Sequence, residues 1–326
     1  MKRIIIVLTA AVFALSASAQ ELNVASFNIR NGKSLKPGQE MPKKGDYSKN
    51  NGWDQRKAEV CALINHEAFD IFGSQEVRKP QLDDMLAMLP DYDYVGVGRD
   101  HGDNRGEFSP VFYRKDKFDL VGSGTFWLSE TPDKSGSALP NANYPRICTW
   151  AHLRDKVTGY EYIHVNTHLD HLGGSDGRSL RTAQTRVILE YLKSLPDVPM
   201  VMTGDFNQAK TNSEENTYAI FKNILGQSNF TASTGEKMTG NFSDARAEAK
   251  DTVASDAWAS MTAYWQEGGE KYNPAKKPID YVFYTTGDFT AEVYRNIHYH
   301  RDGIYMSDHL PQYCELTVTV PAADGE

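Results

Sequence analysis

Short apolar runs and amphipathic segments alternate in the first part of the sequence. Residues 22–29 form an apolar run typical of a β-strand, and residues 53–69 place apolar side chains at helical spacing among charged ones. Residues 70–74 predict a second short strand, and residues 80–89 predict a helix with leucine and methionine on one face. This order of strand, helix, strand and helix favours layered α/β packing.

The rest of the chain is richer in predicted strands. Residues 146–154 and 160–167 predict a hairpin, 178–195 and 214–225 predict helices, and 228–278 reads as a loop-rich insertion because it is polar, glycine-rich and weakly periodic. Apolar runs bounded by Gly, Asp and Pro predict further strands at residues 92–97, 109–114, 118–121, 125–128, 199–202, 279–285, 290–297 and 312–320.

The N-terminus has the pattern of a secretory signal. Lys2 and Arg3 precede the apolar residues 4–15, and small residues follow up to Ala19. The apolar run is too short to span a membrane, and no cysteine follows that would carry a lipid anchor. We therefore expect residues 1–19 to be a signal peptide and residues 20–326 to form a single domain, exported to the periplasm or the outside without a stable membrane anchor.

Charge and cysteine usage restrict the function further. Removal of the two basic residues with the signal lowers the formal net charge from −8 to −10, which argues against tight nucleic-acid binding through a broad basic face. A bound metal ion can still supply positive charge locally for attack on a phosphodiester. Cys61, Cys148 and Cys314 lack metal-type spacing and are predicted to be buried structural thiols.

Polar residues follow several apolar runs where the predicted strands end. In residues 199–207 an apolar run stops at Gly204, Asp205 and Asn207, a pattern that suits a hydrated cation but is also common in turns. Each such residue has a structural alternative, such as a helix cap or a buried histidine, yet their coincidence favours one shared site. The candidates are Asn28, Glu76, Asn166, Thr167, His168, Asp205, Asn207, Asp280, Ser307, Asp308 and His309.

Six of these short stretches resemble the endonuclease/exonuclease/phosphatase superfamily, in family order and over essentially the whole chain. The superfamily includes pancreatic-type deoxyribonuclease, abasic-site endonucleases, deadenylases, neutral sphingomyelinases and inositol-polyphosphate 5-phosphatases. The resemblance implies a four-layer α/β/β/α sandwich of two packed mixed sheets flanked by helices. The stretches are SFNIR (26–30), QEV (75–77), NTHLDH (166–171), GDFN (204–207), IDYVF (279–283) and SDHLP (307–311).

The resemblance also implies a metal site. Glu76 corresponds to the main metal carboxylate, with Asn28 beside it and Asp308 also facing the ion. Oxygen ligands of this kind suit Mg²⁺, with Mn²⁺ as the alternative. His309 resembles the histidine that activates the attacking water, and Asp280 resembles the carboxylate that orients this histidine.

Further residues take roles around the phosphate in the same resemblance. Asp205 and Asn207 correspond to the pair that positions water and phosphate, and His168 to the histidine that donates to a phosphate oxygen or assists the leaving group. Glu107 stands where some members carry the carboxylate partner of that histidine, and Arg146 where a residue can contact phosphate; a surface ion pair is the alternative for both.

The core motifs leave the substrate open, because loops grafted on the sheets determine specificity. We expect direct hydrolysis of a phosphodiester, with nucleic acid or a nucleotide as partner; a phosphomonoesterase, a lipid or inositol phosphate hydrolase, or a silent binding protein are the alternatives. Trp127 and Trp150 are either base-stacking platforms or core aromatics, and the 228–278 stretch is the best candidate for shaping the substrate site. No protein partner can be inferred.

Overall fold

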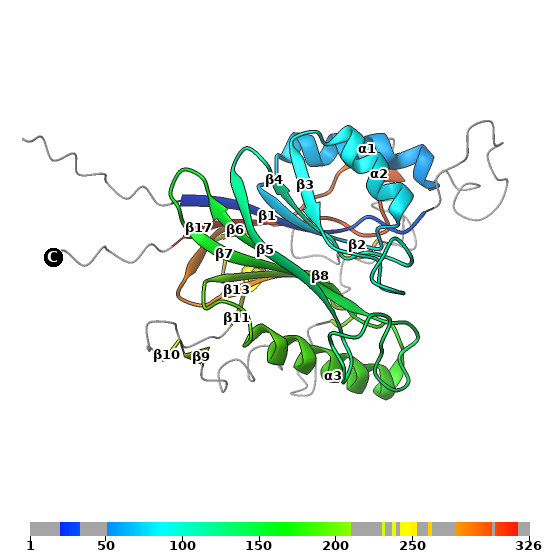
Figure 1. Cartoon of the computed structure of the whole chain (residues 1–326). Helices are drawn as coiled ribbons and strands as arrows, with labels where there is room; N and C mark the ends of the chain where they lie inside the picture. Colours follow the sequence, from blue (N-terminus) through cyan, green and yellow to red (C-terminus); the bar gives the residue numbers. More distant parts are fainter. Residues whose placement is uncertain are drawn as a thin grey trace, which may run out of the picture.

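Two β-sheets pack face to face, and helices cover their outer faces (Figure 1). The computed structural model describes residues 20–32, 51–209, 230–231, 237–238, 242–252, 260–262, 278–301 and 304–318. Within these residues the layers form the α/β/β/α sandwich that the sequence resemblance implied, and both sheets are mixed, so the predicted fold class is confirmed.

The first sheet has seven strands in the order β12-β14-β17-β1-β2-β4-β3. The β1–β2 pair is parallel, because α1 connects the two strands, whereas β17 runs antiparallel to β1. The strands are β1 (Gln20–Asn28), β2 (Ile71–Gln75), β3 (Tyr92–Val95), β4 (Val111–Arg114), β12 (Asp251–Thr252), β14 (Phe289–Asn296) and β17 (Gln312–Val318).

The second sheet has six strands in the order β11-β13-β8-β7-β6-β5. The predicted hairpin is present as β6 and β7, and β8 runs parallel to β7. The strands are β5 (Phe118–Trp127), β6 (Ile147–Asp155), β7 (Glu161–His168), β8 (Met200–Asp205), β11 (Phe242–Asp244) and β13 (Asp280–Thr285); two small ribbons pair β9 (Phe230–Thr231) with β10 (Lys237–Met238) and β15 (His300–Arg301) with β16 (Ile304–Tyr305).

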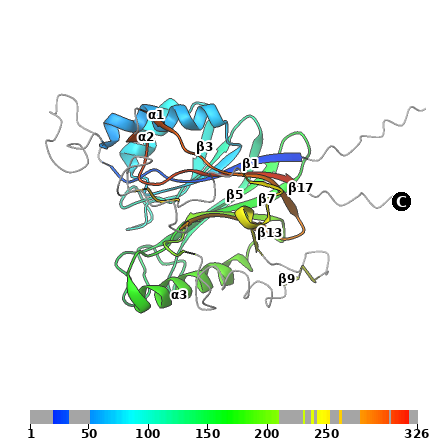
Figure 2. The same ribbon diagram turned by 180° about the vertical axis from the view of Figure 1, so that it is seen from behind.

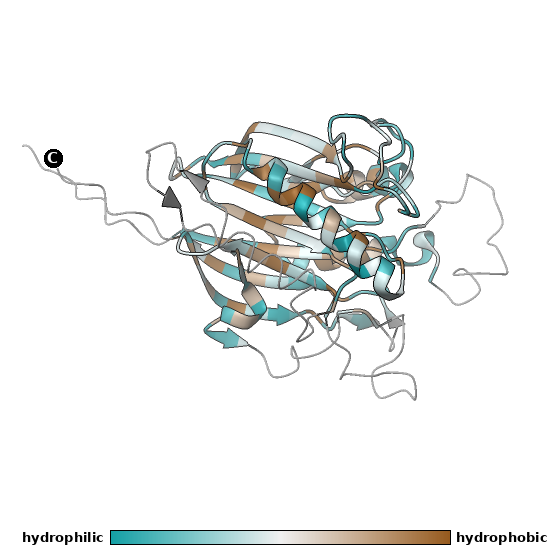
Figure 3. Ribbon diagram, turned by 90° about the horizontal axis from the view of Figure 1, so that it is seen from below, coloured by the Kyte–Doolittle hydropathy of each residue, from teal (hydrophilic) through white to brown (hydrophobic). Residues whose placement is uncertain are grey.

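Each outer face is covered because the helices are amphipathic. Helices α1 (Trp53–Glu67) and α2 (Lys79–Met88) pack on the seven-stranded sheet, and α3 (Gly174–Leu192) lies across the six-stranded sheet (Figures 2 and 3). A third apolar cluster fills the space between the sheets, with Val24 and Tyr113 from one sheet and Val201 and Val282 from the other. The short helix α5 (Ala245–Glu248) follows β11.

A polar seam joins the two sheets beside this apolar cluster. Asn166 of β7 donates to the carbonyl oxygens of Ser74 and Pro110, at 2.7 and 2.9 Å, and accepts from Gln75 at 2.7 Å. The sheets approach so closely that a Cβ on Gly73 would lie 2.0 Å from Thr203 Oγ1. Only glycine fits there, and the seam fixes the sheets relative to one another.

Two sequence-based expectations differ from the structure. Residues 118–128 were expected as two strands, but β5 is continuous with a bulge between Leu120 and Gly122. Part of the 228–278 stretch is not an insertion of loops, because β11 pairs with β13 and β12 pairs with β14. The expected helix at 214–225, the signal peptide and the aromatic residues Trp258, Tyr264, Trp265 and Tyr272 lie outside the described residues.

The cysteine prediction is confirmed, since Cys61, Cys148 and Cys314 are free and buried. None of the helices in the described part of the chain is long and apolar enough to cross a membrane.

Candidate functional site

A pocket of about 440 Å³ opens at the edge of the sandwich where the predicted site residues meet. The strand register explains this meeting: His168 at the end of β7, Asp205 at the end of β8 and Asp280 at the start of the antiparallel β13 lie side by side across three strands. The lining residues are Arg30, Asn31, Glu76, Arg78, Arg99, Glu107, Tyr144, Arg146, His168, His171, Asp205, Asn207, Met261, Asp308 and His309.

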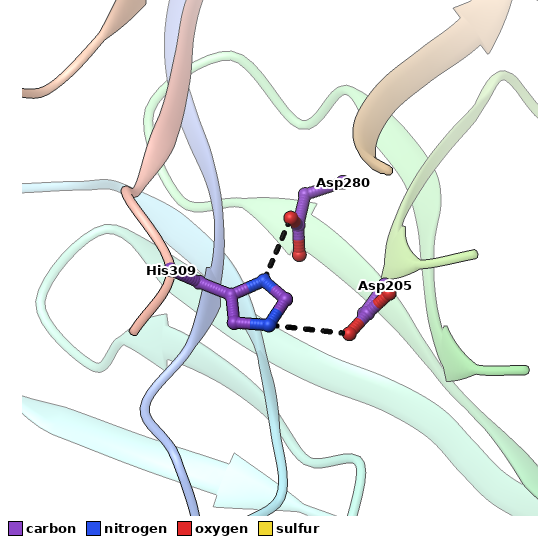
Figure 4. Close-up of side chains that lie close together, drawn as sticks. All are labelled: Asp205, Asp280 and His309. Carbon is purple, nitrogen blue, oxygen red and sulfur yellow. Dashed lines mark hydrogen bonds and ion pairs between the residues drawn. The ribbon is translucent and has the colours of Figure 1, made fainter. Parts of the chain in front are cut away.

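His309 and Asp280 form a buried pair. The distance between His309 Nδ1 and Asp280 Oδ2 is 2.8 Å, and the other ring nitrogen, Nε2, lies 3.8 Å from Asp205 Oδ2 (Figure 4). Ser260 donates its hydroxyl to the same Asp280 oxygen and accepts from the backbone N–H of Ile279 and of Asp280, at 3.0 and 3.1 Å. The carboxylate is therefore held from two sides and orients the histidine with Nδ1 protonated.

The charges in this group are strongly coupled. Burial alone would lower the pKa of His309, but Asp280 and Asp205 outweigh it and hold this pKa well above its usual range. Burial, with a further contribution from Asp280, raises the pKa of Asp205 to about 7. These shifts favour the protonated form of His309 beside the two carboxylates.

His168 is held in its neutral form next to Asp205. Burial and the nearby Arg146 and Arg99 keep the pKa of His168 well below its usual range. Asn207 Nδ2 lies 3.0 Å from both His168 Nε2 and the carbonyl oxygen of Leu169. Since Nδ2 donates to the carbonyl, its second hydrogen meets Nε2, which places the His168 proton on Nδ1.

Glu76, Asn28 and Asp308 lie close to this group. Glu76 accepts from the backbone and side-chain nitrogens of Asn31, both at 2.8 Å, and Asn28 Nδ2 bridges Glu76 and Asp205 at 3.3 and 3.0 Å. Burial would raise the pKa of Glu76, but Asn31, His309 and Arg30 outweigh it and lower this pKa. Burial, and the charge of Glu76, raise the pKa of Asp308.

This donor set fits a hard divalent cation. The carboxylates of the partly buried Glu76 and the buried Asp308 repel one another, and oxygen ligands are what Mg²⁺ and Mn²⁺ prefer. A second group of possible ligands, Asp205, Asp280 and His309, is buried and mutually close. There the Nδ1 proton of His309 is engaged by Asp280, so this group serves better as a proton-handling pair.

Glu107 lies in the pocket but does not pair with His168. Its carboxylate contacts Arg99 at 2.7 Å and Arg78 at 3.8 Å, whereas the carboxylate near His168 is that of Asp205, whose Oδ2 lies 3.5 Å from His168 Nε2. The reason is the loop between β3 and β4, whose backbone brings Arg99 and Glu107 together through the bond from Arg99 N to Glu107 O at 3.0 Å. Glu107 therefore fixes an arginine rather than a histidine.

Arg146, just before β6, is buried in the wall of the pocket near Arg99. Its Nη2 donates to His171 Nδ1 at 2.9 Å, and its Nε lies 3.7 Å from the fully buried Asp170. Trp127 and Trp150 do not reach this wall: Trp127 donates to the carbonyl oxygen of Arg99 from a buried position, and Trp150 packs against the core beneath α3. They are core aromatics.

Three pocket residues have left-handed backbone conformations that residues other than glycine rarely adopt. The φ angles are +57° at Arg30, +62° at Glu76 and +48° at Asn207. Such conformations cost roughly 1–3 kcal/mol each and cluster at functional sites, where the surrounding structure enforces them. They turn the chain sharply just after β1, β2 and β8, so that side chains enter the pocket.

Several residues at the pocket were missed by sequence reasoning. Asn31 and Arg78 directly follow recognised motifs, and His171 is the last residue of the motif at 166–171, so the motifs themselves were an available signal. Arg99 and Ser260 had no such signal, because each comes from a loop whose position depends on contacts distant in sequence. The whole missed set is Arg30, Asn31, Arg78, Arg99, Tyr144, His171, Ser260 and Met261.

Comparison with known proteins identifies the family. Residues 25–309 match the Endonuclease/Exonuclease/phosphatase family model, and a Bacteroides thetaiotaomicron protein of that family has a crystal structure with a TM-score of 0.76 at 32% identity, covering 93% of this chain and all of that one. The chain belongs to this family. Its members hydrolyse phosphate esters and depend on a divalent metal ion.

Two further relatives are informative. A mannosyl-6-phosphatase of Bacteroides thetaiotaomicron is 32% identical, with a TM-score of 0.73 over 90% of this chain and 99% of that chain. Nocturnin of Drosophila melanogaster is 24% identical over 305 residues, which cover 84% of this chain and 43% of that protein. The chain thus spans less than half the length of this curated relative.

Proposed function

We propose that this member of the endonuclease/exonuclease/phosphatase family hydrolyses a phosphate ester of a small molecule by direct attack of water. The observation that carries the proposal is the buried His309–Asp280 pair, whose Nε2 side faces Asp205. His309 of this pair lines the same pocket as the oxygen ligands Glu76 and Asp308. A base that takes a proton and a site for a cation that binds phosphate are the two requirements of the reaction.

The site residues have separate roles in the proposed hydrolysis. His309 takes a proton from water while the water oxygen bonds to phosphorus, and Asp280 stabilises the resulting imidazolium. The ester P–O bond breaks, and the departing oxygen takes a proton from surrounding water to leave as an alcohol. Glu76 and Asp308 would hold a divalent cation, which would supply positive charge for the phosphate oxygens and, by offsetting the carboxylates, would lower the pKa of His309.

Asn207 and neutral His168 are placed to orient the substrate. Their side chains contact each other at 3.0 Å beside Asp205, and both line the pocket. Because His168 is kept neutral, it contributes a directed hydrogen bond and no positive charge that would repel a bound cation. Asp205 holds the group together through Asn28 and the backbone N–H of Asn207, at 3.0 and 2.9 Å.

A small substrate is supported by the pocket and by one relative. A volume of about 440 Å³ suits a molecule such as a sugar phosphate. The mannosyl-6-phosphatase relative makes sugar phosphates the first class to test. The phosphodiester that the sequence favoured uses the same groups, so we keep it in the test panel.

We also propose that residues 1–19 direct export and are removed, which leaves residues 20–326 as one catalytic domain in the periplasm or outside. Support comes from the basic and apolar composition of residues 2–15. N-terminal sequencing of the protein recovered from the producing cells tests this; an intact Met1 in the mature fraction would overturn it.

The experiment that tests the activity is hydrolysis by purified protein with Mg²⁺ or Mn²⁺ and with chelator. The panel contains mannose 6-phosphate, inositol phosphates, a bis-aryl phosphodiester, single-stranded DNA, RNA and sphingomyelin, with the His309→Ala variant as control. We expect hydrolysis that chelator abolishes and that the variant lacks. Activity that persists in chelator, or in the folded variant, contradicts the proposed mechanism.

A further inference from the structure

Two buried guanidinium groups on one wall of the pocket lack acceptors for part of their hydrogens. Within the described part of the chain, Arg146 Nε and Nη1 and Arg99 Nε have no hydrogen-bond partner. The side chains are only 3% and 9% exposed, so water does not satisfy them freely. A buried N–H without an acceptor is costly, which makes an anion the expected partner for this wall.

The charges of the two arginines are only partly offset. Glu107 contacts Arg99 at 2.7 Å. Asp170, by contrast, lies 3.7 Å from Arg146 Nε and already accepts hydrogen bonds from the backbone and side-chain nitrogens of Asn143, both at 3.1 Å. Burial and the neighbouring charge of Arg99 lower the pKa of Arg146. The two guanidinium groups thus repel one another in a place that water reaches poorly, and a bound anion relieves both effects.

Neighbouring groups complete the wall. Because Arg146 Nη2 donates to His171 Nδ1, the ring of His171 carries its proton on Nε2 and offers a further donor. The ring of Tyr144 lies 4.8 Å from the Arg99 guanidinium and 6.2 Å from the His171 ring, while remaining half exposed at the mouth. The aromatic side chain restricts the arginine and narrows the entrance over it.

This basic wall lies beside the hydrolytic group. Arg146 and Arg99 are close enough to His168 to lower its pKa, and the charge of Asp205 acts on Arg146. Arg99, Arg146, His168 and Asp205 all line the same pocket. A single phosphate group can therefore face the Glu76–Asp308 side with some of its oxygens and the arginines with others.

We propose that Arg99 and Arg146 form a clamp for the terminal phosphate of a phosphomonoester, and that this clamp makes the protein select monoesters over diesters. The inference rests on the proposed function and names its substrate class. A monoester carries about −1.5 to −2 charges at neutral pH and three terminal oxygens. A diester has one charge and two such oxygens, and its second organic group would occupy the place that the guanidinium forks need.

The first experiment compares two substrates with the same leaving group. Wild-type protein, Arg99→Met and Arg146→Met are assayed with Mn²⁺ on p-nitrophenyl phosphate and on methyl p-nitrophenyl phosphate. We expect each variant to lose about 10- to 100-fold more kcat/KM on the monoester than on the diester, the size of a lost charge-assisted hydrogen bond. Arg105→Met is the matched control, because Arg105 belongs to the same loop, is 63% exposed and does not line the pocket.

The second experiment measures binding without metal or turnover. Titration of the full chain with inorganic phosphate in chelator, followed by calorimetry, should show binding that tightens as phosphate becomes a dianion above about pH 7. Arg146→Met and Arg99→Met should weaken it about tenfold or more, and Arg105→Met should not. If a methionine variant fails to fold, Arg146→Lys, which keeps the charge but not the fork, should still bind phosphate more weakly than wild type.

The outcomes separate the two proposals. Equal losses on monoester and diester, or phosphate binding that is indifferent to both arginines, overturn the clamp. Arginine-dependent phosphate binding by a protein that hydrolyses no ester overturns the proposed function while supporting the clamp as an anion site. A wild type that prefers the diester, or that cleaves nucleic acid faster than any monoester, overturns the assignment of substrate class.

Discussion

Replacement of Ser260 by alanine tests how the base of the proposed reaction is held. The Ser260 hydroxyl is fully buried, donates to the Asp280 oxygen that also meets His309, and accepts from the backbone N–H groups of Ile279 and Asp280. The segment is itself fixed against the loop before β17, because Leu310 N donates to the carbonyl oxygen of Ser260 at 2.7 Å. Loss of the hydroxyl removes contacts from Asp280 without touching His309.

The magnitude follows from these contacts. A hydrogen bond to a charged acceptor contributes about 1.5–3 kcal/mol, and the two backbone N–H groups lose their shared acceptor as well. If the loss falls on the transition state, kcat/KM drops about 10- to 100-fold. Without the hydrogen bond from Ser260, the Asp280 carboxylate accepts more strongly from the Nδ1 proton of His309 and raises the pKa of His309 further. The acid limb of the pH–rate profile should therefore move to higher pH, by roughly one unit for each 1.4 kcal/mol.

The assay is kcat/KM against pH on a chromogenic phosphate ester at saturating Mn²⁺, together with thermal unfolding. Ser260→Cys fills the same space with a weak donor, so it separates packing from hydrogen bonding and should shift the profile as alanine does. Ser243→Ala is the matched control, since that hydroxyl bonds Thr286 on the far part of the six-stranded sheet, at 2.8 Å. An Ser260→Ala enzyme that loses stability but keeps the wild-type pH profile would show that Ser260 only packs, and the reasoning about Asp280 would be wrong.

Three other substitutions probe the site and the seam. His309→Ala should lower kcat about 10²–10⁴-fold with an unchanged circular dichroism spectrum; wild-type turnover by the folded variant excludes His309 as the base. Glu76→Gln should weaken the Mn²⁺ titration of activity, and an unchanged titration removes Glu76 from the ligand set. In wild type the stabilisation by Mn²⁺ should grow as the pH rises, because the cation competes with the proton on Asp308, whose pKa is raised by burial and by the charge of Glu76. Gly73→Ala should destabilise the fold by about 1–3 kcal/mol or more in denaturant unfolding, since its Cβ would meet Thr203. Gly122→Ala is the control and should be neutral, because the nearest atom to its added Cβ lies at 3.6 Å. Equal stabilities of the two variants would contradict the close approach of the sheets at the seam.

The regular elements were predictable because each is specified locally. Helices α1 and α2 and strands β1 and β2 follow from periodicity and from the breakers between them. Strand β5 was divided in two by Gly122 and Gly124, which look like breakers in the sequence. In the structure Trp150 of the neighbouring strand lies over both glycines, at 3.6 and 2.8 Å from the positions of an added Cβ, so the missing side chains are replaced by a partner distant in sequence.

The site residues that lie at the ends of strands were predictable from the sequence, whereas those that loops bring to the site were not. Asp205 is the last residue of β8 and Glu76 directly follows β2, so the strand ends indicate where both lie. Ser260 and Arg99 are placed by pairing with Leu310 and Glu107, through contacts that have no local signature. Glu107 does not pair with His168 for the same reason: the β3–β4 loop places its carboxylate against Arg99, so the expected partner of the histidine binds an arginine instead.

The pocket depends on the two sheets being fixed relative to one another. Glu76 belongs to the end of the seven-stranded sheet, and Asp205 and Asp280 to the six-stranded sheet, so the separation between the cation ligands and the base is set by the seam. Asn28 shows how small that separation is, because one amide nitrogen reaches carboxylates of both sheets. A change that widens the seam should therefore impair metal binding and proton transfer together, even though it touches neither group.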